Sequence, residues 1–159
     1  MKPRMHISIR TATLEDEGAF LSFNEALSGR ELPRDGFARA WRENMQAKGN
    51  IYILAEAEGK PVGMGSCHVQ WLLHHAEAIA EIQELYVAPG FRSCGVGVAL
   101  LEALISFAGK AGATQVELST NRKRLDAHRF YAREGFADTH LKWVKEIKKS
   151  GPQYADRFS

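Results

Sequence analysis

The spacing of hydrophobic residues divides the chain into stretches with strand-like and helix-like periods. Ile7 and Ile9 alternate with polar neighbours, as in a strand that is buried on one face, whereas Phe37 and Trp41 recur at helical spacing. The pattern predicts strands at residues 7–9, 51–56, 62–69, 79–87 and 115–120, two last strands within 136–147, helices after Thr13 and after Asp35, and helices at 97–111 and 125–134. The chain is therefore expected to mix strands and helices.

The stretch from Glu81 to Leu101 organises the rest of the chain. Its predicted strand is followed by a sharp loop and by a helix that opens on Gly95 and Gly97. Free N–H groups and the positive end of the dipole at the start of such a helix suit a phosphate-bearing ligand. The loop matches neither the phosphate loop of NTPases nor the dinucleotide fingerprint, whose first glycine is missing. The helix has only a narrow polar stripe, so it should pack on the sheet.

Composition limits the class of protein. The chain has 159 residues, of which 45% are hydrophobic, and this favours a single domain with its core at about 7–147 and a C-terminal tail at 148–159. A formal net charge of +2 and the lack of a basic block argue against a nucleic-acid partner. Cys67 and Cys94 could form at most one bridge, and neither a signal peptide nor a long apolar span is visible. We therefore expect a cytoplasmic protein without a membrane partner.

Two motifs resemble those of one enzyme family. The first is Arg92-x-x-Gly95-x-Gly97 after a strand, and the second runs from Asn121 to Phe136. Together they are similar to the GNAT family of N-acetyltransferases. The resemblance implies an α/β (α+β) fold with a strongly bent, mostly antiparallel sheet of six or seven strands and four helices. It also implies acetyl-CoA as co-substrate and a small-molecule amine as partner, and it leaves a homodimer open.

The same resemblance assigns acetyl-CoA to particular residues. Backbone groups at the end of the strand would pair with the pantetheine arm, and N–H groups of the loop would hold the pyrophosphate. An asparagine after the fifth strand would bind the arm, and a tyrosine on the last helix would donate to the sulfur. The expected cofactor-binding residues are Leu85, Tyr86, Val87, Arg92, Ser93, Cys94, Gly95, Val96, Gly97, Val98, Asn121 and Tyr131.

Transfer of acetyl from a thioester to an amine requires a base for the ammonium proton and an acid for the departing thiolate. The resemblance makes Glu81 the first candidate for the base, acting directly or through water, Glu84 the second, and Tyr131 the acid. Strand alternation predicts that Glu81 shares a face with Leu85 and Val87, and that Glu84 points the other way unless a bulge intervenes. For either carboxylate, an ion pair or a substrate-orienting anion is the alternative role.

Further matches indicate a subgroup of the family. The stretches 72–75, 81–85, 117–121 and 126–135 resemble the aminoalkylphosphonate N-acetyltransferases, so an aminoalkylphosphonate is the favoured acceptor. His75, Arg30 and Glu84 are the candidates for binding it. A polyamine, an aminoglycoside or a protein amine is the alternative acceptor. An alternative of a different class is a non-catalytic module that binds acyl-CoA.

Four histidines raise the question of a metal site. His68, His74, His75 and His128 match no structural zinc spacing, and no cysteine belongs to the cluster. We therefore predict no metal site made by the protein alone. Known members of the resembling subgroup are linked with divalent metals, which leaves open a metal that binds together with a phosphonate.

Overall fold

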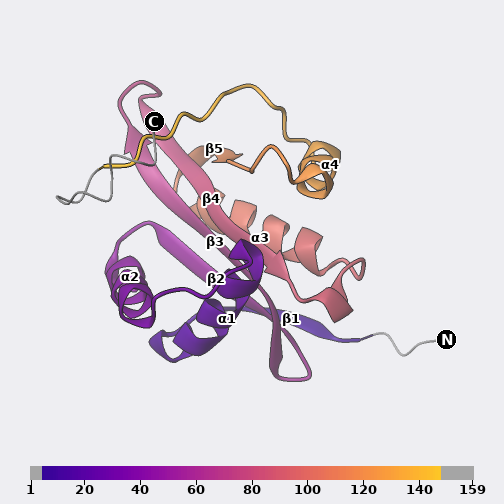
Figure 1. The fold of residues 1–159 in the computed structure, drawn as a ribbon. Coiled ribbons are helices and arrows are strands. Elements are labelled where there is room, and N and C mark those ends of the chain that lie inside the picture. The colour runs from indigo at the N-terminus through magenta and orange to yellow at the C-terminus, as the bar shows by residue number, and fades with distance from the viewer. Residues whose placement is uncertain (1–4, 148–159) are drawn as a thin grey trace.

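The strands form one sheet of five strands in chain order, β1-β2-β3-β4-β5 (Figure 1). The computed structural model describes residues 5–147. The first three neighbouring pairs are antiparallel and the last, between β4 and β5, is parallel. This confirms the predicted α+β class and the mostly antiparallel sheet. The strands are β1 (Ile7–Thr11), β2 (Asn50–Ala57), β3 (Lys60–Leu72), β4 (Glu77–Val87) and β5 (Ala113–Leu118).

Four α-helices accompany the sheet, as expected. They are α1 (Glu17–Ser28), α2 (Arg34–Gln46), α3 (Val96–Lys110) and α4 (Leu125–Arg133), and two short 3-10 helices, η1 (Leu14–Asp16) and η2 (Pro89–Phe91), precede α1 and α3. Figure 1 shows α1 and α2 on one side of the sheet, α3 on the other and α4 beyond β5. Among the described residues, no helix combines the length and the apolar content that crossing a membrane requires.

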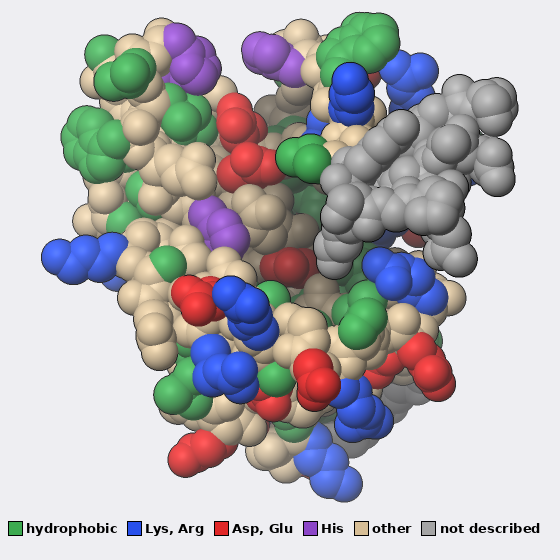
Figure 2. Space-filling view, turned by 60° about the vertical axis from the view of Figure 1, so that its left-hand side comes forward, with side chains coloured by type: hydrophobic (Ala, Val, Ile, Leu, Met, Phe, Trp, Pro, Cys, Tyr) green, Lys and Arg blue, Asp and Glu red, His purple; other side chains and the backbone are tan. Residues whose placement is uncertain are grey.

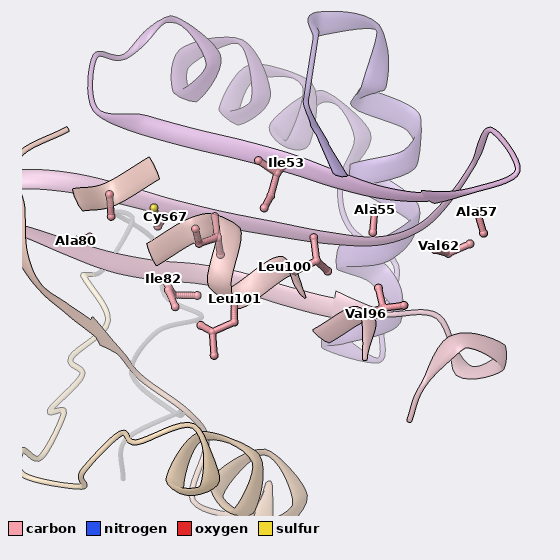
Figure 3. Packing of buried hydrophobic residues seen from close by; sticks show 12 residues of the cluster. Ile53, Ala55, Ala57, Val62, Cys67, Ala80, Ile82, Val96, Leu100 and Leu101 are labelled. Atoms are coloured by element: carbon pink, nitrogen blue, oxygen red, sulfur yellow. The ribbon is translucent and has the colours of Figure 1, made fainter. Parts of the chain in front are cut away.

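Strand alternation gives each face of the sheet its own hydrophobic core. On one face Ile53, Cys67 and Ile82 pack with Leu100 and Leu101 of α3 (Figure 3). Each such leucine, once fully buried, stabilises the fold by roughly 1.5–3 kcal/mol. On the other face, the core under α1 and α2 consists of Ala12, Phe20, Trp41, Tyr52, Leu54 and Met64. Among the described residues, the sheet is therefore the layer that both cores share.

Two glycines let α3 approach β3 closely. A Cβ on Gly63 would lie 2.8 Å from the carbonyl oxygen of Tyr86 and 3.2 Å from Cδ1 of Leu100. A Cβ on Gly65 would lie 3.0 Å from Cδ1 of Leu104. The 2.8 Å distance is shorter than real Cβ contacts, and the other two are tighter than most, so a side chain at either position would require β4 or a leucine of α3 to shift.

The expected number of strands, six or seven, is wrong for the described residues, in which there are five. Residues 136–147 form no strand there, although Leu141 and Trp143 keep the alternating pattern that predicted one. Their side chains are 67% and 89% exposed, so alternation alone does not make a strand when no neighbour covers the apolar face. The tail predicted at 148–159 lies outside the described residues.

Candidate active site

A bulge in β4 brings the two candidate bases to the same face of the sheet. Ile82 pairs with Cys67 and Glu84 with Ser66, so Gln83 is an extra residue in the ladder. One extra residue reverses the alternation that follows it. Glu81 and Glu84 therefore both face the side of α1 and α2, with Tyr86.

The predicted sharing of a face by Glu81, Leu85 and Val87 is therefore wrong. Leu85 and Val87 pack with the core under α3, on the opposite face from Glu81. The cause is the bulge, which strict period-two counting does not include.

The bulge also marks the point where β4 and β5 separate. In the part of the chain that the structure describes, their pairing ends at Ile82 and Leu118, whereas β4 continues to Val87. Strand alternation puts the backbone groups of Leu85 and Val87 on the open edge and those of Tyr86 toward β3. Of the three strand residues expected to pair with the pantetheine arm, only Leu85 and Val87 direct their backbone groups to this open edge. The Val87 carbonyl already accepts a hydrogen bond of 3.0 Å from Nε of Arg92.

The loop before α3 has the backbone shape of an anion site. Ser93 and Gly95 both have positive φ, of 62° and 80°, and Gly95 is the N-cap residue immediately before α3. The first helical hydrogen bond runs from the Ala99 N–H to the Gly95 carbonyl, so the N–H groups of residues 96–98 have no partner within the helix. These groups fit the predicted pyrophosphate site.

Gly97 lies where the start of α3 meets α4 and β4. A Cβ built on it would lie 3.7 Å from the ring of Phe130 and 3.8 Å from Cγ2 of Val87, which are ordinary van der Waals distances. Phe130 in turn lies next to Tyr131, with ring centroids 5.2 Å apart.

The hydroxyl of Tyr131 is suited to donate a proton at neutral pH. Burial raises the pKa of Tyr131, and the charge of Arg124 opposes this effect by lowering it. The ring is held by edge contacts with Phe130 and Phe136, at 5.2 and 5.6 Å between centroids. A phenol in this environment stays protonated and has a fixed direction.

The two carboxylates differ in their surroundings. Burial raises the pKa of Glu84, and a hydrogen bond from the Ser66 hydroxyl opposes this by lowering it. Ser66 also accepts a hydrogen bond of 3.1 Å from the Glu84 N–H, so one buried hydroxyl holds both ends of that residue. Glu81 lies opposite His68 on β3 and opposite Glu117 on β5. Figure 2 shows this side of the molecule hollowed, with acidic side chains on the wall of the hollow and deep within it.

Three other predicted site residues are in loops: Arg30 and His75 are exposed, and Asn121 makes a hydrogen bond within its own loop. Arg30 is exposed just after α1, and His75 is exposed in the turn between β3 and β4, where its ring lies 4.5 Å from that of His74. The strand from Glu77 to Glu81 alone spans about 13 Å, so His75 lies outside contact distance of Glu81 along β4. The Asn121 side-chain oxygen accepts a hydrogen bond of 2.9 Å from the Lys123 N–H.

Four residues of this face were not predicted as site residues. Ser66 and His68 follow one another on the same face of β3, Tyr52 is next to them on β2, and Glu117 is opposite Glu81 on β5. A polar residue at every second position of an otherwise apolar strand was the available signal for Ser66 and His68. Placing them beside Glu84 and Glu81 requires the register between strands.

No group of three or more histidine, cysteine, aspartate or glutamate side chains that could hold a metal ion occurs among residues 5–147. Cys67 and Cys94 are both free. Cys67 is buried, and burial raises the pKa of its thiol to about 11, so it acts as a small apolar core residue.

The comparisons with known proteins agree with this geometry. The model of the Acetyltransferase (GNAT) family matches residues 17–136, from the start of α1 to just past α4. An aminoalkylphosphonate N-acetyltransferase of Salmonella typhimurium is 42% identical over 139 residues, which cover 87% of this chain and 90% of that protein.

Solved structures share the fold. A transcriptional regulator from Bacillus halodurans, 25% identical, has a TM-score of 0.80 and is matched over 89% of this chain and 100% of that one. The aminoglycoside N-acetyltransferase AAC(6')-Iy in complex with CoA, 18% identical, has a TM-score of 0.81 over 94% of this chain and 100% of that one. By its sequence and its fold, the chain belongs to the GNAT family of N-acetyltransferases.

Proposed function

We propose that this N-acetyltransferase moves acetyl from acetyl-CoA to the amino group of an aminoalkylphosphonate. The observation that carries the proposal is the 42% identity with the Salmonella aminoalkylphosphonate N-acetyltransferase, because it extends over 87% of this chain and is not confined to the acyl-CoA motif. The family uses acetyl-CoA and acts on amines, so the acceptor is the part of the proposal that needs a test.

The cofactor would follow the open edge of β4 and end at the start of α3. Leu85 offers its backbone groups and Val87 its N–H to the amides of the pantetheine arm, while the Val87 carbonyl is engaged by Arg92. The N–H groups of residues 96–98 offer donors for the pyrophosphate. Arg92 adds a positive charge beside the end of β4, because its Nε donates to the Val87 carbonyl and its guanidinium lies 5.5 Å from the ring of Tyr86. Bound in this way, acetyl-CoA supplies the activated acetyl group.

Glu81 is the proposed base and Tyr131 the proposed acid. Glu81, acting directly or through water, takes a proton from the acceptor ammonium, and the freed amine forms the new C–N bond as the C–S bond breaks. Tyr131 then gives its proton to the departing sulfur, the new amide nitrogen loses its second proton to solvent, and Tyr131 is reprotonated from solvent. Glu84 is held by Ser66 in a more buried place, which suits a group that orients the amine.

The role of Tyr131 can be tested by removing its hydroxyl alone. Tyr131→Phe keeps the ring contacts and should lower kcat by roughly 10²–10⁴-fold, the usual contribution of a positioned acid. Affinity for acetyl-CoA, measured by calorimetry, should stay close to that of the unmodified protein. Unchanged turnover would exclude Tyr131 from the proton transfer.

A phosphonate acceptor needs cations at the end away from the carboxylates. Glu81, Glu84 and Glu117 lie on the face of the sheet toward α1 and α2, from which the acceptor would approach; we call it the acceptor face. A dianion placed among these carboxylates would be repelled. Arg124 is at the start of α4, close enough to Tyr131 for its charge to lower the pKa of the phenol. Arg124 is therefore the first proposed anchor for the phosphonate, and Arg30, in the loop after α1, is the second. His75 lies too far from Glu81 along β4 for a short aminoalkylphosphonate to reach both residues.

The acceptor is tested by a matched pair of amines. With acetyl-CoA and free thiol release as the readout, 2-aminoethylphosphonate should have a much higher kcat/KM than propylamine, which has the same reactive amine and no anion. Changing the anchoring arginine to glutamine should remove that preference and spare acetyl-CoA affinity. Equal use of the two amines would contradict the proposal.

A polyamine is the second candidate acceptor, and the three carboxylates on the acceptor face are the observation in its favour. A second ammonium group of spermidine would be attracted where a phosphonate is repelled. If spermidine has a higher kcat/KM than 2-aminoethylphosphonate in the same assay, the acceptor is a polyamine and no anion site exists.

A further inference from the structure

Three polar side chains form a line across the middle of the sheet, one each from β2, β3 and β4. Tyr52 and His68 are joined by a hydrogen bond of 2.9 Å between the phenol oxygen and Nε2. His68 lies directly opposite Glu81 in the register of β3 and β4, and such partners on one face have Cβ atoms about 4.5–5.5 Å apart. Burial lowers the pKa of His68, and the charge of Glu81 opposes this by raising it, so the two side chains interact. The line connects the proposed base to the interior of the fold.

The inner end of this line is held by the core under α1 and α2. The ring of Tyr52 is in edge contact with Phe20 and Trp41, with centroids 5.8 and 5.6 Å apart and planes at 74° in both pairs. Burial raises the pKa of Tyr52, and the charge of Glu84 adds to this effect, so the phenol is protonated at neutral pH. Its oxygen is therefore a fixed point from which a second side chain can be oriented.

We propose that His68, held in place by Tyr52, is the positioning residue that orients the Glu81 carboxylate toward the acceptor amine. The Tyr52 O–H donates to Nε2, which leaves the proton of the neutral imidazole on Nδ1 for donation to Glu81. Neither Tyr52 nor His68 touches the reacting atoms. The inference rests on the proposed role of Glu81 as the base.

The neighbouring charges explain why Glu81 needs such a donor. Glu117 lies opposite it on β5, and Glu84 follows on the same face of β4. Both carboxylates repel the carboxylate of Glu81, whereas an imidazole N–H can donate to it and fix its direction. On the two strands paired with β4, His68 is thus the donor that stands opposite Glu81, and Glu117 is the like charge.

The test is the pH dependence of kcat/KM for a set of variants. His68→Leu should lower kcat/KM at neutral pH by roughly 10- to 100-fold, the cost of a misplaced catalytic group, and should move the acid limb of the profile to higher pH. Tyr52→Phe, which keeps the ring packing, should shift the limb in the same direction by less. His68→Asn keeps a donor near the position of Nδ1 and should restore most of the activity. The control is His6→Leu, an exposed histidine outside the site, which should leave the profile unchanged.

A double variant separates this inference from the proposed function. If His68 acts through Glu81, His68→Leu combined with Glu81→Gln should lose no more activity than Glu81→Gln alone. Two results would overturn the positioning role and leave the base intact. One is additive losses of activity in the double variant. The other is an acid limb that Glu81→Gln removes but that neither His68→Leu nor Tyr52→Phe moves. An unchanged profile in Glu81→Gln would instead remove the base itself, and the inference with it.

Discussion

Glu84 combines two requirements that conflict in a single residue. It is largely covered beside Tyr52 and Ser66, where a charge is costly, yet it lies on the face that the acceptor amine would approach in the proposed function. Burial raises the pKa of its carboxyl above the ordinary value, so ionising it costs more in the folded protein than in the unfolded chain. If Glu84 orients the amine as proposed, it serves activity at the expense of stability.

This conflict predicts the direction in which stability changes with pH. Because the folded pKa of Glu84 is raised, its contribution to stability is fully present below the unfolded pKa, about 4.3, and is lost as the pH rises through the folded pKa. Glu84→Gln does not titrate and keeps an oxygen that can accept from Ser66. The variant should therefore have a higher Tm than the unmodified protein near neutral pH, and the difference should vanish in acid.

Thermal unfolding followed by circular dichroism across this pH range measures the effect. Glu102→Gln on the exposed side of α3 is the matched control and should give the same Tm difference at every pH. A Glu84→Gln variant that is less stable than the unmodified protein near neutral pH would show that the ionised carboxylate is favoured in the fold, against the raised pKa.

At the scale of elements, the spacing of hydrophobic residues predicted the positions of most helices and strands, but it did not predict the bulge in β4. The helix predicted at 97–111 is α3 at Val96–Lys110, because its nearly continuous apolar surface leaves few alternatives. The bulge at Gln83 was not predictable, because it depends on how β4 pairs with β3 and not on β4 itself. That one residue decides which face Glu84 occupies and lies just beyond the last pair between β4 and β5.

The same distinction applies to the site. Glu81 and Tyr131 could be proposed from sequence because they fall within motifs of fixed spacing. Ser66, His68 and Tyr52 could not be connected with them, since each contact joins different strands and depends on register. Sequence patterns predicted the groups proposed to react, whereas the groups proposed to hold them in place became visible only with the strands paired.

At the scale of the whole molecule, the two cores depend on each other because they share one sheet. Gly63 is at the centre of this dependence, since its Cβ position touches the backbone of β4 and Leu100 of α3. Trp41 reports on the opposite core and is 5% exposed, whereas Trp71 and Trp143 are 76% and 89% exposed and should change little on unfolding. The two faces can therefore be followed separately in the same experiment.

We propose that the chain unfolds as one cooperative domain. Gly63→Ala should lower the free energy of unfolding by about 1–3 kcal/mol, the usual cost of overpacking, because Cβ would enter the space of the Tyr86 carbonyl. Although the change is made against α3, the midpoint of Trp41 fluorescence in urea should move by the same amount as the midpoint of far-UV circular dichroism. The matched control is Gly109→Ala on α3, where a Cβ has no atom within 4 Å and helix propensity favours alanine, so its midpoint should stay or rise.

Equal shifts of the urea midpoints from Trp41 fluorescence and from circular dichroism would distinguish one cooperative domain from two layers that unfold independently. If the α1 and α2 layer could fold without α3, Gly63→Ala would shift the circular dichroism midpoint and leave Trp41 fluorescence where it was. The structure argues against that outcome, because Tyr52, Leu54 and Met64 of the Trp41 core belong to the same strands as Ile53 and Cys67 of the α3 core. Losing α3 would expose one face of β2 and β3, and the strands that hold Trp41 would lose the apolar burial that keeps them paired.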